Sequence, residues 1–392
     1  MYECLQCARS DSVEVIAMSV ESKKYPIGMH PALPPPSGSV GPVRWMRDNL
    51  FSSISNTVLT VLGLYLIFTI IPPFIQWAFI DSVFSGADNR KACLALMGEQ
   101  KGACWSFVYN RWGQFVYGFY PQEERWRVDV SMVLIALTVA IVLIEKLRAN
   151  KALQIVAIVL PISCYFLITG GSFGLEEVPT SKMGGVMLTL IVGLTGIFVS
   201  LPISIGLALS RISKLPIFSI FATIFIEFIR GVPLITLLFI ASSLLSYFLP
   251  PGSNFDLLLR VLIMVTIFSA AYIAEVIRGG LAAIPKGQYE AADALGLSYW
   301  QSMRLIILPQ ALKISIPGIV GSFIGLFKDT TLVVIIGLLD PLGIGMAAIS
   351  TSEWAGLGTE LYVFIGMFFF IFCFGMSRYS LHLEKKLNTG HK

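Results

Sequence analysis

The sequence has few charged residues. Only 13% of its 392 residues are Asp, Glu, Lys or Arg, whereas 55% are hydrophobic, and the mean hydropathy is +0.77. A soluble fold has too little interior to bury so large an apolar fraction, so the composition excludes an ordinary soluble protein and favours a polytopic membrane protein. The net charge of +4 is small, and the Lys and Arg residues stand between apolar runs, which argues against a nucleic-acid partner.

The sequence also lacks the patterns that hold nucleotides and metals. No Gly-x-x-x-x-Gly-Lys-Ser/Thr loop occurs, so phosphate chemistry has to reside on another chain. Cys4 and Cys7 have the spacing of a zinc or redox site, but no second Cys pair or nearby His completes it, and we expect no metal or cofactor in this chain. No signal peptide precedes the linker rich in Pro, Gly and Ser from His30 to Pro42. Residues 1–17 are either a tail or an extension upstream of a start at Met18, and the sequence leaves that choice open.

Long apolar runs recur along the chain, each of about the length that a helix needs to cross a bilayer. The Lys and Arg residues gather in every second connection between these runs, which the positive-inside rule places on the cytoplasmic side. We therefore expect an all-α membrane protein of about eight transmembrane helices with both termini cytoplasmic. The predicted spans are Ile54–Ile80, Val130–Ile144, Leu153–Thr169, Gly185–Leu209, a run opened by Pro233, Leu257–Leu281, Pro317–Leu339 and a last run that ends before Arg378.

Two of these runs contain residues that should interrupt a straight helix. Pro72 and Pro73 are expected to kink or end the first span. The stretch 215–249 is too long for one span and contains Glu227 and Arg230, which are costly in lipid. We therefore divide it into a segment along the inner interface and a span that begins at Pro233. Glu227 and Arg230 are three residues apart, and they either pair with each other or act in gating.

The segment from Glu290 to Leu312 is polar and lies between two apolar runs on the predicted inner side. A short helix over Glu290–Leu295 should end at Gly296, because glycine accepts the left-handed conformation that follows a helix. Ser298 and Gln301 have capping-box spacing and should start a second helix that runs to Pro309. The sequence thus predicts a helix-turn-helix on the inner side to which another protein can bind.

The same segment contains a long gapped pattern. It consists of Glu290-Ala291-Ala292, then Gly296, then Ile306-Ile307-Leu308-Pro309 after nine further residues. The pattern resembles the EAA loop of the membrane subunits of ABC importers, through which the permease contacts its ATPase. Flanking segments similar to signatures of the polar amino acid branch are Arg230-Gly231-Val232-Pro233-Leu234, Ala274-Glu275-Val276-Ile277-Arg278-Gly279-Gly280, Gly287-Gln288 and Lys328-Asp329-Thr330-Thr331-Leu332. The resemblance covers residues 184–387, and the N-terminal half resembles the longer permease subunits of the general L-amino-acid importer.

The resemblance implies the transmembrane domain of a type I ABC importer with extra N-terminal spans. Its expected parts are a cytoplasmic tail (1–50), extra spans (51–183) with a large periplasmic loop (81–129), and a permease core (184–392) with a cytoplasmic coupling loop (284–312). It also implies a bacterial inner membrane, a second permease subunit in a heterodimer, two ATPase subunits that bind ATP and Mg²⁺, and a periplasmic amino-acid-binding protein. The chain itself is then no enzyme. Its expected ATPase-coupling residues are Glu290, Ala291, Ala292, Gly296, Leu308 and Pro309.

The function predicted in this way is ATP-driven translocation of L-amino acids across the inner membrane. Two alternatives stay open, an ion-coupled secondary amino acid transporter and a regulatory membrane scaffold without transport. Buried Glu275, Lys328 and Asp329 would suit ion coupling, although the inverted repeats typical of such transporters are not evident. The sequence does not say which amino acids are carried, which subunit pairs with this one or whether substrate binds in this subunit.

Lys328 and Asp329 are predicted to lie near the bilayer centre, about ten residues into the span that opens near Gly318. Because neighbours on a helix point about 100° apart, each needs a partner elsewhere, and Glu275 is a candidate for Lys328. The predicted substrate-pathway residues are Ser269, Tyr272, Glu275, Lys328, Asp329 and Thr330. Alternatively, the same charges brace two spans or tie this subunit to its partner permease.

The outer loop 81–129 holds two of the cysteines. Cys93 and Cys104 have no apolar span between them, so a disulfide is expected, with two free thiols as the alternative. Cys164 and Cys373 fall within spans and should stay reduced. The many aromatic residues of this loop indicate either a partly folded cap or a lipid-interface belt without a binding role.

Overall fold

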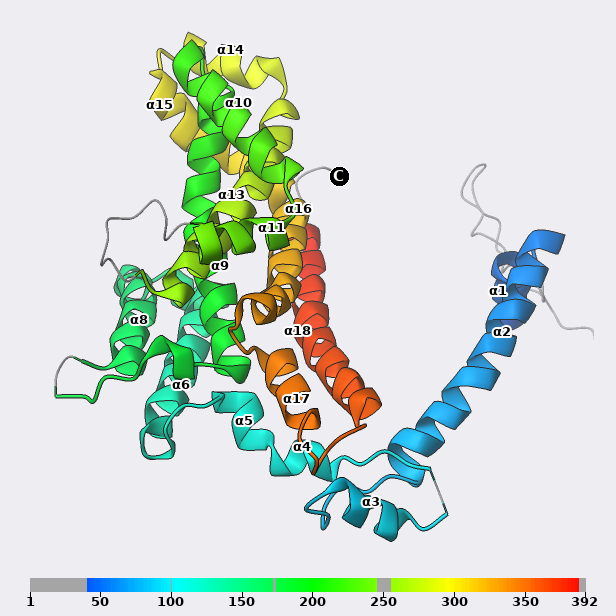
Figure 1. The fold of residues 1–392 in the computed structure, drawn as a ribbon. Helices are drawn as coiled ribbons and strands as arrows, with labels where there is room; N and C mark the ends of the chain where they lie inside the picture. The colour runs from blue at the N-terminus through cyan, green and yellow to red at the C-terminus, as the bar shows by residue number, and fades with distance from the viewer. Residues whose placement is uncertain (1–40, 100, 172–173, 245–254, 388–392) are drawn as a thin grey trace, which may run out of the picture. The chain divides into compact units, whose positions relative to one another are not determined.

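The computed structural model describes residues 41–99, 101–171, 174–244 and 255–387 (Figure 1). Within these ranges the secondary structure is helical, and the β pairing is confined to two isolated bridges, Val83–Cys104 and Gly118–Met183. The predicted all-α fold class is therefore confirmed. The Cys4–Cys7 pair, the tail 1–17 and nearly all of the predicted linker lie outside the described residues.

The chain divides into two compact units, Met1–Phe74 and Ile75–Lys392. The described part of the first unit consists of α1 (Pro42–Asn49) and nearly all of α2 (Ile54–Ile75). The helix α2 contains Pro72 and Pro73 and continues beyond them, then widens into the π-helix η1 (Gln76–Ile80). Of the two expectations for these prolines, a kink or an end of the span, the end is contradicted, because the helical φ suits proline and the widened turn can absorb the displaced carbonyls.

The second unit contains the remaining helices. The long ones are α6 (Arg125–Leu143), α8 (Lys151–Thr169), α9 (Gly185–Arg211), α13 (Leu257–Ala282), α16 (Leu308–Asp329) and α18 (Gly358–Leu387). The shorter α-helices are α3 (Arg90–Met97), α4 (Ser106–Asn110), α5 (Trp112–Tyr117), α7 (Glu145–Arg148), α10 (Pro216–Gly231), α11 (Leu234–Phe239), α14 (Lys286–Ala294), α15 (Tyr299–Ser302) and α17 (Pro341–Ile349). Short 3₁₀ or π segments are η2 (Gln122–Glu124), η3 (Thr180–Lys182), η4 (Ile240–Leu244), η5 (Met303–Ile307) and η6 (Thr330–Ile336).

Seven helices of the described chain are long and apolar enough to cross a membrane, and one bent pair raises the number to eight. The bent pair is α10 and α11 with η4, which meet at an angle of 100° on either side of Val232 and Pro233. The structure thus agrees with the predicted total of about eight spans. It also divides the stretch 215–249 where Pro233 was expected to divide it.

The helix that follows the inner loop is longer than predicted. The segments α15, η5 and α16 follow one another without a gap from Tyr299 to Asp329, and with η6 they form one candidate span, Tyr299–Ile336. The predicted end at Pro309 is wrong, because this proline falls in the first turn of α16, directly after a π-helical turn that leaves room for its ring. Lys328 and Asp329 consequently stand at the C-terminal end of a long helix rather than in the middle of a short one.

The core of the second unit is built around α13, against which α9, α10 and α16 pack (Figure 1). The contact between α13 and α16 depends on small residues. A methyl group added at Gly280 would come within 2.6 Å of the Ala311 carbonyl oxygen, and the Ser315 hydroxyl donates a hydrogen bond to the Val276 carbonyl at 3.2 Å. Small side chains let the two backbones approach closely, as in many membrane helix pairs.

The outer loop 81–129 folds into a compact cap. Phe107 packs edge-to-face on Phe115 and lies 5.6 Å, centre to centre, from Trp354 in the segment between α17 and α18. Two guanidinium groups add polar contacts to that same segment, from Arg90 to the Ala355 carbonyl (2.7 Å) and from Arg111 to the Glu353 carboxylate (2.9 Å). The side chains Tyr109 and Trp112 remain exposed. Of the two alternatives for the aromatic residues of this loop, a folded cap is therefore present, and part of its aromatic content forms its core.

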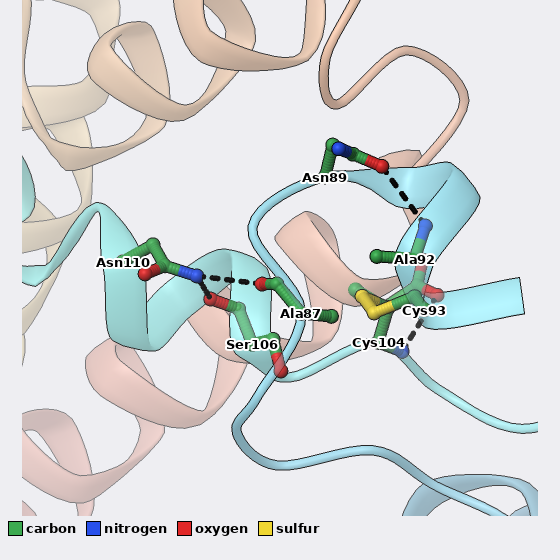
Figure 2. Close-up of a disulfide and its surroundings, with 8 residues drawn as sticks. Ala87, Asn89, Ala92, Cys93, Cys104, Ser106 and Asn110 are labelled. Atoms are coloured by element: carbon green, nitrogen blue, oxygen red, sulfur yellow. Dashed lines mark hydrogen bonds between the residues drawn. A yellow bond between two sulfur atoms is a disulfide. The ribbon is translucent and has the colours of Figure 1, made fainter. Parts of the chain in front are cut away.

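Figure 2 shows the disulfide of this cap and its surroundings. Cys93 and Cys104 are bonded, with 6.0 Å between their Cα atoms. Asn89 caps α3 by accepting a hydrogen bond from the Ala92 amide (2.9 Å). The Asn110 amide group donates to the Ala87 carbonyl (2.8 Å), so the chain before the first cysteine is also held to the helix after the second.

We expect the Cys93–Cys104 bond to protect both thiols in the isolated protein. In denatured, unreduced protein, a maleimide should label Cys164 and Cys373 but not Cys93 or Cys104, and reduction should expose the latter two. Peptide mapping by mass spectrometry measures this site by site. Reduction should also destabilise the cap by about 2 to 3 kcal/mol, because the bond closes a short loop. Labelling of Cys93 and Cys104 before reduction would rule the bridge out.

Candidate coupling and translocation sites

The predicted helix-turn-helix is present between α13 and α16. Its first helix, α14, ends in a Schellman motif, in which the Gly296 amide donates to the Asp293 carbonyl (2.9 Å) and the Leu297 amide to the Ala292 carbonyl (3.2 Å). Gly296 has a φ of +70°, which glycine adopts at no steric cost. This glycine therefore sets the direction in which the chain leaves α14.

The second helix begins at the predicted capping box. The Ser298 amide donates to the Gln301 side-chain oxygen (2.9 Å), and the reciprocal bond from the Ser298 side chain is also present. The first helix, however, begins at Lys286 rather than at Glu290. Pro285 precedes it with a φ of −58°, and a fixed φ of this kind favours a helix start. The sequence prediction was four residues late because it counted only from the acidic residue.

The helix-turn-helix has one buried side and one exposed side. Ala292 is completely buried, and the Gln310 side chain donates to that of Gln288 (3.1 Å), which ties α14 to the start of α16. The predicted coupling residues divide accordingly, since Glu290, Ala291, Gly296 and Pro309 are exposed while Leu308 is partly buried. Two large apolar side chains are also exposed, Leu295 by 74% and Trp300 by 69%. An acidic and apolar surface of this kind, at one end of the helices, is suited to a protein partner.

A second site lies between α13 and α16, farther along the two helices. It is a cavity of about 240 Å³ whose lining residues are Phe268, Ser269, Tyr272, Ser322, Gly325, Leu326 and Asp329. The structure thus brings together three of the predicted pathway residues, Ser269, Tyr272 and Asp329. The Ser269 hydroxyl is buried and has no hydrogen-bond partner among the described residues. A largely apolar cavity with one acidic group and two serine hydroxyls is chemically suited to a ligand that carries an ammonium.

The other predicted pathway residues lie elsewhere. Glu275 was a candidate partner of Lys328, and this is wrong, because its carboxylate accepts from Arg211 (2.8 Å) and Arg278 (2.7 Å). Lys328 is exposed and is not among the residues that line the cavity. Thr330 is buried, and its hydroxyl donates to the Phe327 carbonyl (2.8 Å) within its own helix.

The partners of Glu275 belong to an ion-pair network that joins three helices. Arg211, the last residue of α9, binds Glu275 of α13 and also Glu227 of α10 at 2.7 Å. The predicted pairing of Glu227 with Arg230 is present but longer, at 3.8 Å. The three-residue spacings within α10 and α13 were visible in the sequence, whereas the contribution of Arg211 was missed because it depends on where α9 ends in space.

Comparison with known proteins identifies the family. Residues 200–389 match the family described as "Binding-protein-dependent transport system inner membrane component". The chain is 47% identical over 363 residues to the inner membrane amino-acid ABC transporter permease protein YhdY of Escherichia coli K12, a match that covers 92% of this chain and 97% of the relative. It is 44% identical over 423 residues to the glutamate/glutamine/aspartate/asparagine transport system permease protein BztC of Rhodobacter capsulatus, covering 92% and 96% of the two chains. A solved amino acid ABC transporter with histidines is 30% identical and aligns with 51% of this chain and 91% of its own, with a TM-score of 0.45.

The chain therefore belongs to the family of binding-protein-dependent transport system inner membrane components. Within that family it is a permease subunit of an amino-acid ABC transporter, a multi-pass membrane component that works with ATPase and other permease subunits. The resemblance to this family, which the sequence motifs indicated, is confirmed. The ion-coupled alternative receives no support from these relatives.

We expect Glu275→Gln to destabilise the folded protein more than Glu227→Gln does. Glu275 is 22% exposed and binds two arginines, whereas Glu227 is 53% exposed and makes one short contact, so solvent screens it better. Loss of the Glu275 carboxylate should cost about 1 to 3 kcal/mol, because two arginines then lose their shared acceptor. Thermal unfolding in detergent measures both variants, with Glu384→Gln on α18 as a control. Equal losses in all three variants would contradict a structural role for the network.

Proposed function

We propose that this chain and a different, second permease subunit form the membrane path of an importer for L-amino acids. Two ATPase subunits would bind ATP and Mg²⁺ on the inner side, and a periplasmic binding protein would deliver the substrate. The name of the Rhodobacter capsulatus relative makes glutamate, glutamine, aspartate and asparagine the first substrates to test. The family match at 200–389 supports placing the permease core at 184–392, after N-terminal spans at 51–183.

The observation that carries this proposal is the exposed surface of the helix-turn-helix. Glu290, Leu295 and Trp300 project from an element that is well fixed internally, by a Schellman motif, a capping box and the buried Ala292. The second helix of this element continues into α16 without a break. A 31-residue helix from Tyr299 to Asp329 is about 46 Å long at 1.5 Å per residue. A movement imposed by the ATPase at the loop would therefore tilt α16 as a rigid body and change the cavity beside Asp329.

The cavity between α13 and α16 is our candidate contact for the substrate. Asp329 would bind the ammonium of an amino acid, and Ser269 and Ser322 could supply hydrogen bonds. Arg230 lies over the Tyr272 ring, 5.6 Å from its centre, and its Nε has no acceptor among the described residues. This guanidinium is the candidate for the substrate carboxylate. A zwitterion would thus find one charge of each sign near the same tyrosine.

The proposed orientation places both termini in the cytoplasm. The Lys386 ammonium near the end of α18 binds the Glu145 carboxylate of α7 at 2.6 Å. The short basic connection between α6 and α8 and the end of the last span therefore lie on one side of the unit. Basic residues at that side are expected for the cytoplasmic face. The pair also lowers the pKa of Glu145, because a nearby ammonium favours the charged carboxylate.

We expect Glu290→Lys and Gly296→Pro to uncouple ATP hydrolysis from uptake without unfolding the spans. The first change reverses the exposed charge, and the second cannot adopt the φ of +70° and removes the amide that closes the Schellman motif. Uptake into vesicles should fall at least tenfold, about the effect of losing one charged contact at an interface. Transport and ATPase activity of the purified complex are the measurements.

Two variants control for this experiment. Glu384→Lys makes the same charge reversal on an exposed residue near the end of α18, and it should transport normally. Gly296→Asn introduces a side chain that tolerates the left-handed conformation, so it should retain more coupling than Gly296→Pro. If Glu290→Lys and Glu384→Lys transport equally well, the helix-turn-helix is not the coupling element.

We expect Asp329→Asn to weaken uptake of all amino acids, because an amide holds an ammonium less strongly than a carboxylate does. The apparent KM should rise at least tenfold while the amount of assembled complex stays the same. Ser322→Ala, at another residue of the cavity wall, should have a smaller effect. Competition assays with the amide and acidic amino acids measure the change. An unaltered KM in Asp329→Asn would show that this cavity does not contact the substrate.

A further inference from the structure

Lys328 and Asp329 are adjacent on α16, yet their side chains point to different surfaces. Asp329 lines the cavity shared with α13, whereas Lys328 is exposed and is not among the residues that line the cavity. The Phe327 ring packs on α18, 5.6 Å from the ring of Phe369 and 5.5 Å from that of Phe372. Because successive residues of a helix point about 100° apart, Lys328 faces the open side of α16, between the side that packs on α18 and the side of the cavity.

The depth of Lys328 follows from the contact of the adjacent Phe327 with α18. Phe372, which packs against Phe327, is 14 residues after Gly358 and 15 before Leu387, the two ends of α18, and so lies about 21 to 23 Å from each end at 1.5 Å per residue. This is the middle of the span. The four-carbon stem of a lysine covers well under half of the about 15 Å between the bilayer centre and either headgroup layer. Lys328 therefore cannot reach the lipid headgroups from there, and acyl chains cannot solvate its charge.

The described residues of this chain offer Lys328 no carboxylate. It takes part in none of their ion pairs, since Glu275 is held by Arg211 and Arg278, and Asp329 faces the cavity. Glu360 is buried in the first turn of α18, where its carboxylate accepts a hydrogen bond from the Cys104 amide. The anion that balances Lys328 therefore comes from outside the described residues.

The face of α16 beside Lys328 is shaped for another helix. Gly321 and Gly325 stand in Gly-x-x-x-Gly spacing, and a methyl group added at either would meet no atom of the described residues within 4 Å. Gly325 also lines the cavity, so this face borders the cavity and a helix packed on it would cover the cavity's edge. Lys328 follows Gly321 by seven residues, which is two helical turns, and so lies on the same side. A helix can approach such a glycine face closely, and membrane helices associate through spacings of this kind.

We infer that Lys328 pairs with a carboxylate of the second permease subunit, whose helix packs on the Gly321–Gly325 face of α16. The inference rests on the proposed function, because it requires that second subunit. It gives the two adjacent charges different roles, Lys328 in assembly of the permease pair and Asp329 in contact with the substrate. A charge pair enclosed between two subunits in the membrane stabilises assembly and fixes the register of the two helices.

The first test is to crosslink from position 328 in the assembled transporter. A photoreactive benzoylphenylalanine at position 328 of the full chain should crosslink to one helix of the second permease, which mass spectrometry identifies. The second test is assembly. Lys328→Met should reduce the second permease that co-purifies with this chain at least tenfold, and Lys328→Glu more, since it places two like charges together. Lys313→Met is the matched control, because Lys313 is exposed on the same helix near its inner end and should leave assembly unchanged.

The third test reverses the charge in both subunits at once. A carboxylate of the second permease near the crosslinked position, changed to lysine, should restore assembly of Lys328→Glu. The inference is overturned by crosslinks only to lipid or to another copy of this chain, or by full assembly of Lys328→Met. It is also overturned if Lys328→Met assembles fully and only alters the KM for acidic amino acids, which would assign the lysine to the substrate carboxylate. Failure of the proposed function looks different, since the parental complex would then lack ATPase subunits or ATP-dependent uptake.

Discussion

The close contact between α13 and α16 is the constraint on which the two sites of this protein depend. Gly280 of α13 leaves no room for a side chain against Ala311, and the Ser315 hydroxyl binds the Val276 carbonyl, so the helices are held together near their inner ends. The chain between them is the helix-turn-helix, whose two ends are therefore fixed in space. Farther along the same pair, the helices enclose the cavity at Asp329. One helix pair thus connects the surface proposed for the ATPase with the place proposed for the substrate.

Much of the fold could be predicted from local patterns. Apolar length gave the spans, and the capping box at Ser298 and the glycine at position 296 were identified correctly, because each depends on residues within one turn of the chain. The effect of proline on the helices was predicted less well. Pro72 and Pro309 are both compatible with a continuing helix, the first through a π-helical segment that follows it and the second because it stands in a first turn. A sequence alone does not distinguish those situations from a break.

The side-chain partners in the membrane could not be predicted in the same way. The helical spacing placed Ser269, Tyr272 and Glu275 in order along α13, but only the packing of α9 showed that Arg211 takes Glu275 and leaves the cavity with Ser269 and Tyr272. Which charged side chains pair with each other depends on distances between helices in space, and the spacing of residues in the sequence does not give those distances. The rule that a buried ion requires a partner was sound, whereas the choice of partner needed the arrangement of three helices.

The distribution of strong contacts indicates where this subunit can change shape. At the outer end, the Cys93–Cys104 bond and the contacts of Arg90 and Arg111 hold the cap to the segment before α18. At the inner end, Arg211 joins α9, α10 and α13 through two carboxylates. Around Asp329, by contrast, the cavity wall on α16 includes the small residues Ser322 and Gly325, and the continuation of α16 beyond Asp329 is a 3₁₀ segment with poorer hydrogen-bond geometry. A rigid tilt of α16 that begins at the proposed coupling element would therefore be absorbed at the cavity and at η6, where we propose that access to the two sides of the membrane alternates.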